Sequence, residues 1–104
     1  MSPEARTDAP NVLLRRYFIK PGHWPAFLAL WRQVVPLRRR HGFEVLFALK
    51  DEENNVFTWA VSYDGDLQAA MDRYYADPER VALEVIGEHV ADFKVTSVER
   101  EPIP

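Results

Sequence analysis

The chain has 104 residues, a formal net charge of −3 and no cysteine. A nucleic-acid-binding domain usually carries a basic excess, so this charge argues against nucleic acid as a partner. The absence of thiols excludes disulfides, cysteine nucleophiles and thiolate metal ligands, and it is compatible with a reducing, cytoplasmic location, which we expect. No apolar segment approaches the roughly 20 residues that span a bilayer, so no membrane partner is expected.

Composition also predicts the domain organisation. Hydrophobic residues make up 47% of the chain, which is enough for one core in a single domain of this length. Residues 1–10 are polar and contain two prolines, a pattern that predicts a flexible N-terminal tail rather than a signal peptide with an apolar centre. We therefore expect one domain over residues 11–100 and a short tail over residues 101–104.

The first predicted element is a strand over residues 11–20, which ends where Pro21 and Gly22 interrupt β-pairing. Apolar residues occur on both of its faces, as is typical of a strand that is covered on both sides. Arg15 and Tyr17 are two residues apart and share one face. The pattern does not decide which face meets the helices, because both faces carry an arginine.

The next predicted element is a helix that begins near Pro25, with apolar residues at three- and four-residue spacing. Pro36 is expected to kink or restart this helix, and Gly42 is expected to cap its end. The rest of the pattern predicts strands over residues 43–50 and 56–63, a helix from Leu67 capped by Asp66, a helical segment from Asp77, and a last strand over residues 93–98.

Periodicity within these elements assigns side chains to faces. In the strand over residues 43–50, strict alternation places four apolar residues on one face, namely Phe43, Val45, Phe47 and Leu49. In the strand over residues 56–63, one face is large and aromatic and the other is small. In the segment after Asp77, helical spacing predicts that the buried side chains are Val81, Val85 and Ile86.

The predicted order of elements is βαββαβ, without internal repeats. This order is typical of a ferredoxin-like α+β sandwich, in which a four-stranded antiparallel sheet carries both helices on one face. The helices leave the second apolar face of the sheet uncovered. Because the sheet of an identical subunit would cover it, we expect a homodimer that forms a dimeric α+β barrel.

Several short motifs occur along the chain, each weak alone: Leu14-Arg15-Arg16-Tyr17, Lys20-Pro21-Gly22, Trp31, Pro36-Leu37 before His41-Gly42, Tyr63-Asp64, and Tyr75-Ala76-Asp77-Pro78-Glu79. In their order and spacing, these motifs resemble the NIPSNAP family within the dimeric α+β barrel proteins. The family pattern places a tryptophan after the last motif, where this chain has Arg80. The resemblance implies a barrel of two packed sheets and implies little about chemistry, since the family has no agreed catalytic residues.

Four residues are candidates for a ligand site. Arg15 and Tyr17 could present guanidinium and phenol donors to an anion or a carbonyl group. Alternatively, Arg15 extends to the sheet edge and Tyr17 belongs to the core. Trp59 and Tyr63 share a face of their strand and could line an apolar pocket, although aromatic strand faces are more often part of the core.

Histidine supplies the candidate for acid–base chemistry. His41 follows the first predicted helix, where related barrels often have the mouth of a cavity, and it could act as a catalytic base or simply interact with the helix dipole. We expect His23 and His89 to be solvated near helix ends, and the spacing of the three histidines predicts no metal site. The run Arg38-Arg39-Arg40 is expected to be a solvated face that offsets the helix dipole, with phosphate binding as the alternative.

No glycine-rich phosphate loop or nucleophile elbow occurs in the chain. Our first hypothesis is a homodimer that binds a small apolar or anionic ligand between sheet and helices, without a cofactor or metal. The second is a cofactor-independent oxygenase or isomerase, in which His41 is the base and Arg15 or Tyr17 stabilises an enolate or oxyanion. The third is an interaction scaffold whose pocket is filled by side chains.

Overall fold

The computed structural model describes residues 11–104, so the tail expected over residues 1–10 lies outside the described residues. Its elements are β1 (Asn11–Ile19), α2 (Trp24–Arg40), β2 (Glu44–Asp51), β3 (Val56–Tyr63), α3 (Leu67–Ala76), α4 (Pro78–Ala82), the 3₁₀-helix η1 (Glu84–His89) and β4 (Val90–Val98). Residues 99–104 follow β4 outside any helix or strand.

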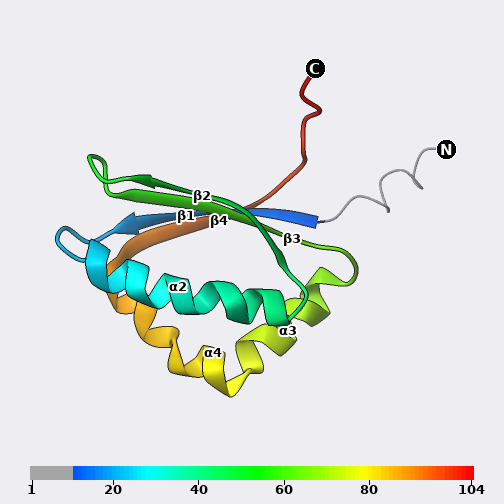
Figure 1. Ribbon diagram of the computed structural model, residues 1–104, viewed down its shortest axis with the longest axis horizontal. Helices are drawn as coiled ribbons and strands as arrows, with labels where there is room; N and C mark the ends of the chain where they lie inside the picture. The colour runs from blue at the N-terminus through cyan, green and yellow to red at the C-terminus, as the bar shows by residue number, and fades with distance from the viewer. Residues whose placement is uncertain (1–10) are drawn as a thin grey trace.

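The four strands form one antiparallel sheet in the order β2-β3-β1-β4. Figure 1 shows the helices together on one side of this sheet, with the other side open. The predicted ferredoxin-like α+β fold with a four-stranded antiparallel sheet is therefore confirmed.

The core lies between the sheet and α2. It contains Leu13 and Ile19 of β1, Phe57 and Trp59 of β3, and Phe27 of α2, all at most 8% exposed. Burial of each such side chain contributes about 1.5–3 kcal/mol. The face of β1 that meets the helices is thus the one that carries Arg15 and Tyr17, which the sequence left open.

The face assignment predicted for β2 is wrong beyond its first residues. The pairing of β2 with β3 shifts register between Val45 and Phe47, which marks a β-bulge. The extra residue reverses the alternation, so Val45 pairs with inward-facing Val61 while Phe47 pairs with Ala60 on the open face. Phe47 and Leu49 are consequently 43% and 61% exposed.

The helical segments also differ from the predicted pattern. The helix α2 runs through Pro36 without restarting. After Asp77, α4 gives way at Leu83 to η1, which has three residues per turn. Of the three side chains predicted to be buried, Ile86 packs against the core. Val81 and Val85 are instead 47% and 41% exposed, and Leu83 is buried.

The open side of the sheet carries an apolar surface. A groove on this side is lined by residues of all four strands and of the segment after β4, namely Val12, Leu14, Glu44, Val45, Leu46, Phe47, Ala60, Val98, Glu99 and Arg100. Charges of both signs border the apolar centre. Among residues 11–104, no helix is long and apolar enough to cross a bilayer.

Candidate ligand-binding site

A cavity of about 280 Å³ lies between the sheet and the helices. Its wall is built by Arg15, Tyr17, Phe27, Trp31, Val34, Arg38, Trp59, Tyr74, Tyr75, Arg80, Ile86, Gly87, Val90 and Phe93. Two of these side chains, Tyr75 and Phe93, are 38% and 63% exposed, so the cavity opens to solvent beside α3 and β4. Three of the predicted site residues line it, namely Arg15, Tyr17 and Trp59, whereas Tyr63 and His41 do not.

A chain of hydrogen bonds links the polar groups of the cavity. Arg15 donates from Nε to the hydroxyl oxygen of Tyr17 at 2.9 Å and from Nη2 to that of Tyr75 at 3.2 Å. Arg38 donates from Nη2 to the same Tyr75 oxygen, also at 3.2 Å. The phenol of Tyr75 is therefore held between two guanidinium groups that come from different layers of the fold.

Arg38 is the most deeply buried of these charges, at 1% exposed. Its guanidinium carbon lies 4.0 Å from the ring centroid of Tyr74 and 4.8 Å from that of Phe43, so aromatic faces offset part of the cost of burying it. Burial and the nearby charge of Arg15 both lower the pKa of Arg38. The prediction that the whole run Arg38-Arg39-Arg40 is solvated is thus wrong for its first member.

Arg80 brings a third guanidinium to the cavity, from α4. It lies 5.0 Å from the ring centroid of Tyr75 and 5.5 Å from that of Tyr74. The buried Nε atoms of Arg80 and Arg38 have no hydrogen-bond partner within residues 11–104, and the same holds for the indole nitrogens of Trp31 and Trp59. The residues of the cavity wall therefore include several buried donors that lack an acceptor within residues 11–104.

Acidic side chains do not balance these three arginines in the described part of the chain. The ion pairs between residues 11 and 104 are Arg40–Glu79, His41–Asp77 and Lys50–Glu52, and none of them involves Arg15, Arg38 or Arg80. A buried charge without a counter-charge is costly. The cavity is therefore electropositive, although the chain as a whole carries a net charge of −3.

The positive charges around the cavity lower the pKa of Tyr75. Burial alone would raise the pKa of its phenol, but the charges of Arg15 and Arg38 and the hydrogen bond from Arg15 outweigh burial, so the pKa lies below its ordinary value. The phenolate form is the one that gains from two guanidinium donors. The cavity thus stabilises negative charge at the Tyr75 oxygen.

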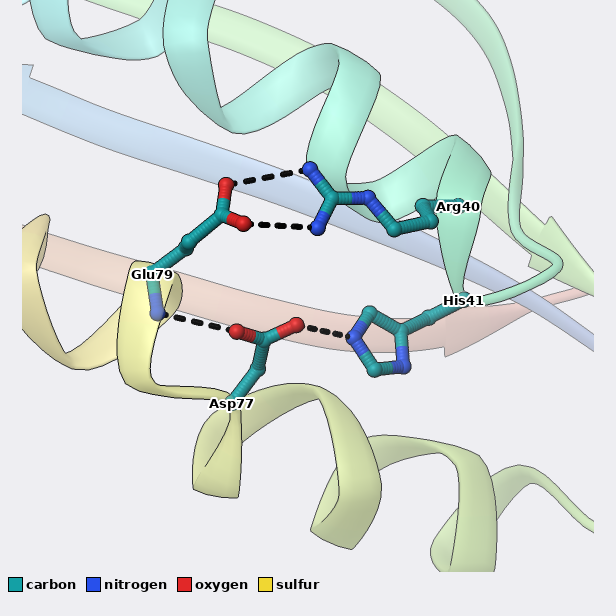
Figure 2. Close-up of polar contacts among 4 residues, drawn as sticks. All are labelled: Arg40, His41, Asp77 and Glu79. Atoms are coloured by element: carbon teal, nitrogen blue, oxygen red, sulfur yellow. Dashed lines mark hydrogen bonds and ion pairs between the residues drawn. The ribbon is translucent and has the colours of Figure 1, made fainter.

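His41 lies at the junction of α2 with α3 and α4, outside the cavity wall. Its Nε2 atom is 2.8 Å from Oδ2 of Asp77, whose Oδ1 accepts a hydrogen bond from the backbone N–H of Glu79. The Glu79 carboxylate in turn accepts two hydrogen bonds from Arg40, as Figure 2 shows. This arrangement ties the end of α2 to the start of α4, and the catalytic role of His41 stays a prediction without support from the cavity.

Tyr63 also lies away from the cavity. Its ring lies beside Gly42 and Gly65, where an added Cβ atom would come within 3.1 and 3.2 Å of ring carbons. Both glycines have positive φ angles, and the Tyr63 hydroxyl accepts a hydrogen bond from Arg73 at 3.2 Å. In this position Tyr63 packs two turns against each other.

The other two histidines form a pair rather than lying free in solvent. The Nδ1 atoms of His23 and His89 are 2.9 Å apart, which joins the loop before α2 to the end of η1. Both lie near helix ends as predicted, but they are half-buried and in contact with each other rather than fully solvated. Among residues 11–104, no group of three or more histidine, cysteine, aspartate or glutamate side chains is arranged to hold a metal.

The sequence carries a signal for two of the residues that our site prediction omitted. Arg38 continues the three- and four-residue spacing of Phe27, Trp31 and Val34, so it lies on the apolar face of α2. Tyr75 is four residues after Met71, on the side of α3 that packs inward. Arg80 has no such signal, because its position depends on the turn at Asp77.

No known protein-family model matches the chain, and no curated protein matches it in sequence. Solved structures do match. An uncharacterised NIPSNAP domain protein from Burkholderia xenovorans has a TM-score of 0.77 at 18% identity, over 88% of this chain and 94% of that one. The chain has the fold of NIPSNAP domain proteins.

Two further solved structures share this fold. A NIPSNAP family protein of unknown function from Agrobacterium tumefaciens has a TM-score of 0.78 at 16% identity, over 88% of this chain and 87% of that one. An antibiotic biosynthesis monooxygenase has a TM-score of 0.68 at 24% identity, over 88% of this chain and 99% of that one. The expected NIPSNAP resemblance is confirmed at the level of the fold.

Proposed function

We propose that the protein is a homodimer that binds a small aromatic anion, such as an arylcarboxylate, in the cavity between its sheet and its helices. The observation that carries this proposal is the set of three guanidinium groups in the cavity wall, none of which pairs with an acidic residue among residues 11–104. Guanidinium groups bind carboxylates through charge-assisted, often bidentate, hydrogen bonds.

The rest of the wall limits the size and polarity of the ligand. Its aromatic side chains include Tyr17, Phe27, Trp31 and Trp59, which suit a planar apolar body. The volume of about 280 Å³ is just below the roughly 300–1,000 Å³ range of ligand pockets, which restricts the ligand to a small molecule. Together these features favour a molecule with one aromatic ring and a carboxylate.

The homodimer is supported by the open face of the sheet. Phe18, Phe47 and Leu49 are 37%, 43% and 61% exposed. By strand alternation and pairing they lie on the face of the sheet that points away from the helices, the side that is open in Figure 1. A second copy suits this face, because an identical surface offers both its apolar centre and border charges of both signs, such as Glu44 and Arg16.

Calorimetric titration with phenylacetate tests the ligand proposal, and neutral phenylacetamide is the matched control. We expect phenylacetate to bind and phenylacetamide to bind at least about 10-fold more weakly, since one charge-assisted hydrogen bond is worth roughly 1.5–3 kcal/mol. The variant Arg80→Met should lose most of this preference, and Arg40→Met, whose guanidinium is exposed, should keep it. Equal affinity for the acid and the amide would contradict the proposal.

A further inference from the structure

The oxygen of Tyr75 stands out among the polar groups of the cavity because it accepts hydrogen bonds from two guanidinium groups. Arg15 and Arg38 both donate to it at 3.2 Å. The guanidinium group of Arg80 lies against the ring of Tyr75. The ring centroids of Tyr74 and Tyr75 are 4.9 Å apart. Within residues 11–104 these arginines are the charged groups that face Tyr75, so every charge around it favours the phenolate.

We propose that Tyr75 is a general base that removes a proton from the carbon next to a carbonyl group of the bound ligand, and that the substrate class is an enolisable aryl 2-oxo acid. This inference rests on the proposed binding of aromatic anions in the same cavity. It adds a reaction, keto–enol tautomerisation, and assigns the proton transfer to a residue that lies in the cavity wall.

The step is redox-neutral and balances without a co-reactant. The Tyr75 phenolate takes the proton, so that a C–H bond breaks and the phenol O–H bond forms. The electron pair of the C–H bond forms the C=C double bond of the enolate, and the π electrons of the carbonyl group move to its oxygen. Return of the proton to that oxygen gives the enol, and its return to carbon regenerates the keto form.

Arg15 and Arg38 stabilise negative charge both before and after the proton transfer, first on the Tyr75 oxygen and then on the enolate oxygen. Once Tyr75 is protonated, its oxygen is a weaker acceptor, and the donors of Arg15 and Arg38 become available to the enolate oxygen. Cationic donors held next to the reacting atoms stabilise the negative charge that develops on the enolate oxygen. Arg80, on α4, remains to hold the carboxylate of the substrate.

The position of Tyr75 satisfies the other requirements of a base. It lines the cavity and is 38% exposed, so a substrate can reach it from solvent. Its pKa is lowered by the arginines despite burial, which raises the phenolate fraction at a given pH. In contrast, the Tyr63 hydroxyl lies outside the cavity and contacts Arg73.

Proton exchange of phenylpyruvate in D₂O, followed by proton NMR, tests the reaction. We expect the wild-type protein and the control Tyr63→Phe to accelerate loss of the benzylic proton signal over the buffer rate. Tyr75→Phe should lower this acceleration by roughly 10²–10⁴-fold, the usual contribution of a general base, while it still binds phenylpyruvate in a calorimetric titration. Equal exchange by Tyr75→Phe and wild type would overturn the role of Tyr75.

The phenolate itself can be measured without any ligand. In an ultraviolet pH titration, the wild type and Tyr63→Phe should show one tyrosine that ionises at lower pH than the others, and Tyr75→Phe should lack it. If phenylacetate binds but phenylpyruvate exchanges only at the buffer rate, the binding function stands and the reaction is rejected. If neither compound binds, both the proposed binding of aromatic anions and the proposed substrate class are rejected.

Discussion

The guanidinium carbon of Arg38 lies 4.0 Å from the ring centroid of Tyr74, so an almost fully buried positive charge is held against an aromatic face rather than a carboxylate. Burial of this charge at the cavity wall therefore lowers the free energy of unfolding. Such a cost is commonly retained where function requires it. Stability and binding should therefore respond in opposite ways when this charge is removed.

Replacement of Arg38 by methionine tests this relationship. Burial and the charge of Arg15 lower the pKa of Arg38, so the folded state disfavours this charge. We expect Arg38→Met to leave the melting temperature unchanged or raised, and to weaken phenylacetate binding by about 10- to 100-fold, the worth of a charge-assisted hydrogen bond. Thermal unfolding and calorimetry measure the two effects, and the exposed neighbour Arg39→Met is the control. A large loss of stability with unchanged affinity would show that Arg38 serves the fold alone.

The dimer makes a separate prediction at the open face of the sheet. Phe47 is already 43% exposed, so Phe47→Lys should leave the fold of one subunit intact and dissociate the dimer. Val81, which is 47% exposed on α4, gives the control variant Val81→Lys. Light scattering after size exclusion should give twice 12.1 kDa for the wild type and the control, and 12.1 kDa for Phe47→Lys. A wild-type mass of 12.1 kDa would rule out the dimer.

The hydrogen bonds at Asp77 predict a pH dependence of stability. The hydrogen bond from His41 and the backbone N–H of Glu79 lower the pKa of Asp77 below its ordinary value of 3.8. Because the unfolded chain then binds a proton more readily than the folded one, the contribution of Asp77 is complete above the ordinary pKa and is lost as the pH falls through the lowered one. Asp77→Asn should lower the melting temperature near neutral pH by several degrees.

The pH profile of this variant gives the decisive comparison. The difference in melting temperature between wild type and Asp77→Asn should shrink as the pH is lowered below about 4. Asparagine can still accept the hydrogen bond from Glu79, so the helix cap is retained as an internal control. A difference that stays constant between neutral and acidic pH would mean that the charge of Asp77 contributes nothing.

A variant of His41 distinguishes a structural role of this residue from the catalytic role that the sequence led us to expect. Because it lies outside the cavity wall and contacts Asp77 at 2.8 Å, His41→Ala should lower the melting temperature and leave phenylacetate affinity and phenylpyruvate exchange unchanged. The same titration and NMR exchange assays measure these quantities. Loss of exchange in a variant that is still folded would restore His41 as the base.

Periodicity predicted the elements of the fold because alternation in β1 and β3 and helical spacing in α2 follow from regular geometry. It failed where geometry is irregular. The bulge after Val45 reversed the faces of β2, and the 3₁₀ segment after Leu83 changed the period of the helix. Neither irregularity has a strong local signature in the residues concerned.

Regular strand geometry also explains why three residues of the candidate site could be predicted from the sequence. Arg15, Tyr17 and Trp59 share the inward face of adjacent strands, where Arg15 pairs with Trp59, so strand alternation alone brings them together. Arg38 was grouped with its charged neighbours instead of with the helix face that its spacing indicates. Arg80 reaches the cavity through a turn and a short helix, and such a tertiary position cannot be read from local spacing.

The most direct test of anion binding observes the arginine side chains themselves. The Nε–H groups of Arg38 and Arg80 are buried and have no hydrogen-bond acceptor among residues 11–104. In ¹⁵N-labelled protein, phenylacetate should shift both side-chain resonances because it places a negative charge beside the two guanidinium groups, and phenylacetamide at the same concentration should not. The exposed Arg39 should remain unshifted with either compound. If phenylacetate leaves the Arg38 and Arg80 resonances in place at saturating concentration, the cavity is not an anion site and the central proposal is wrong.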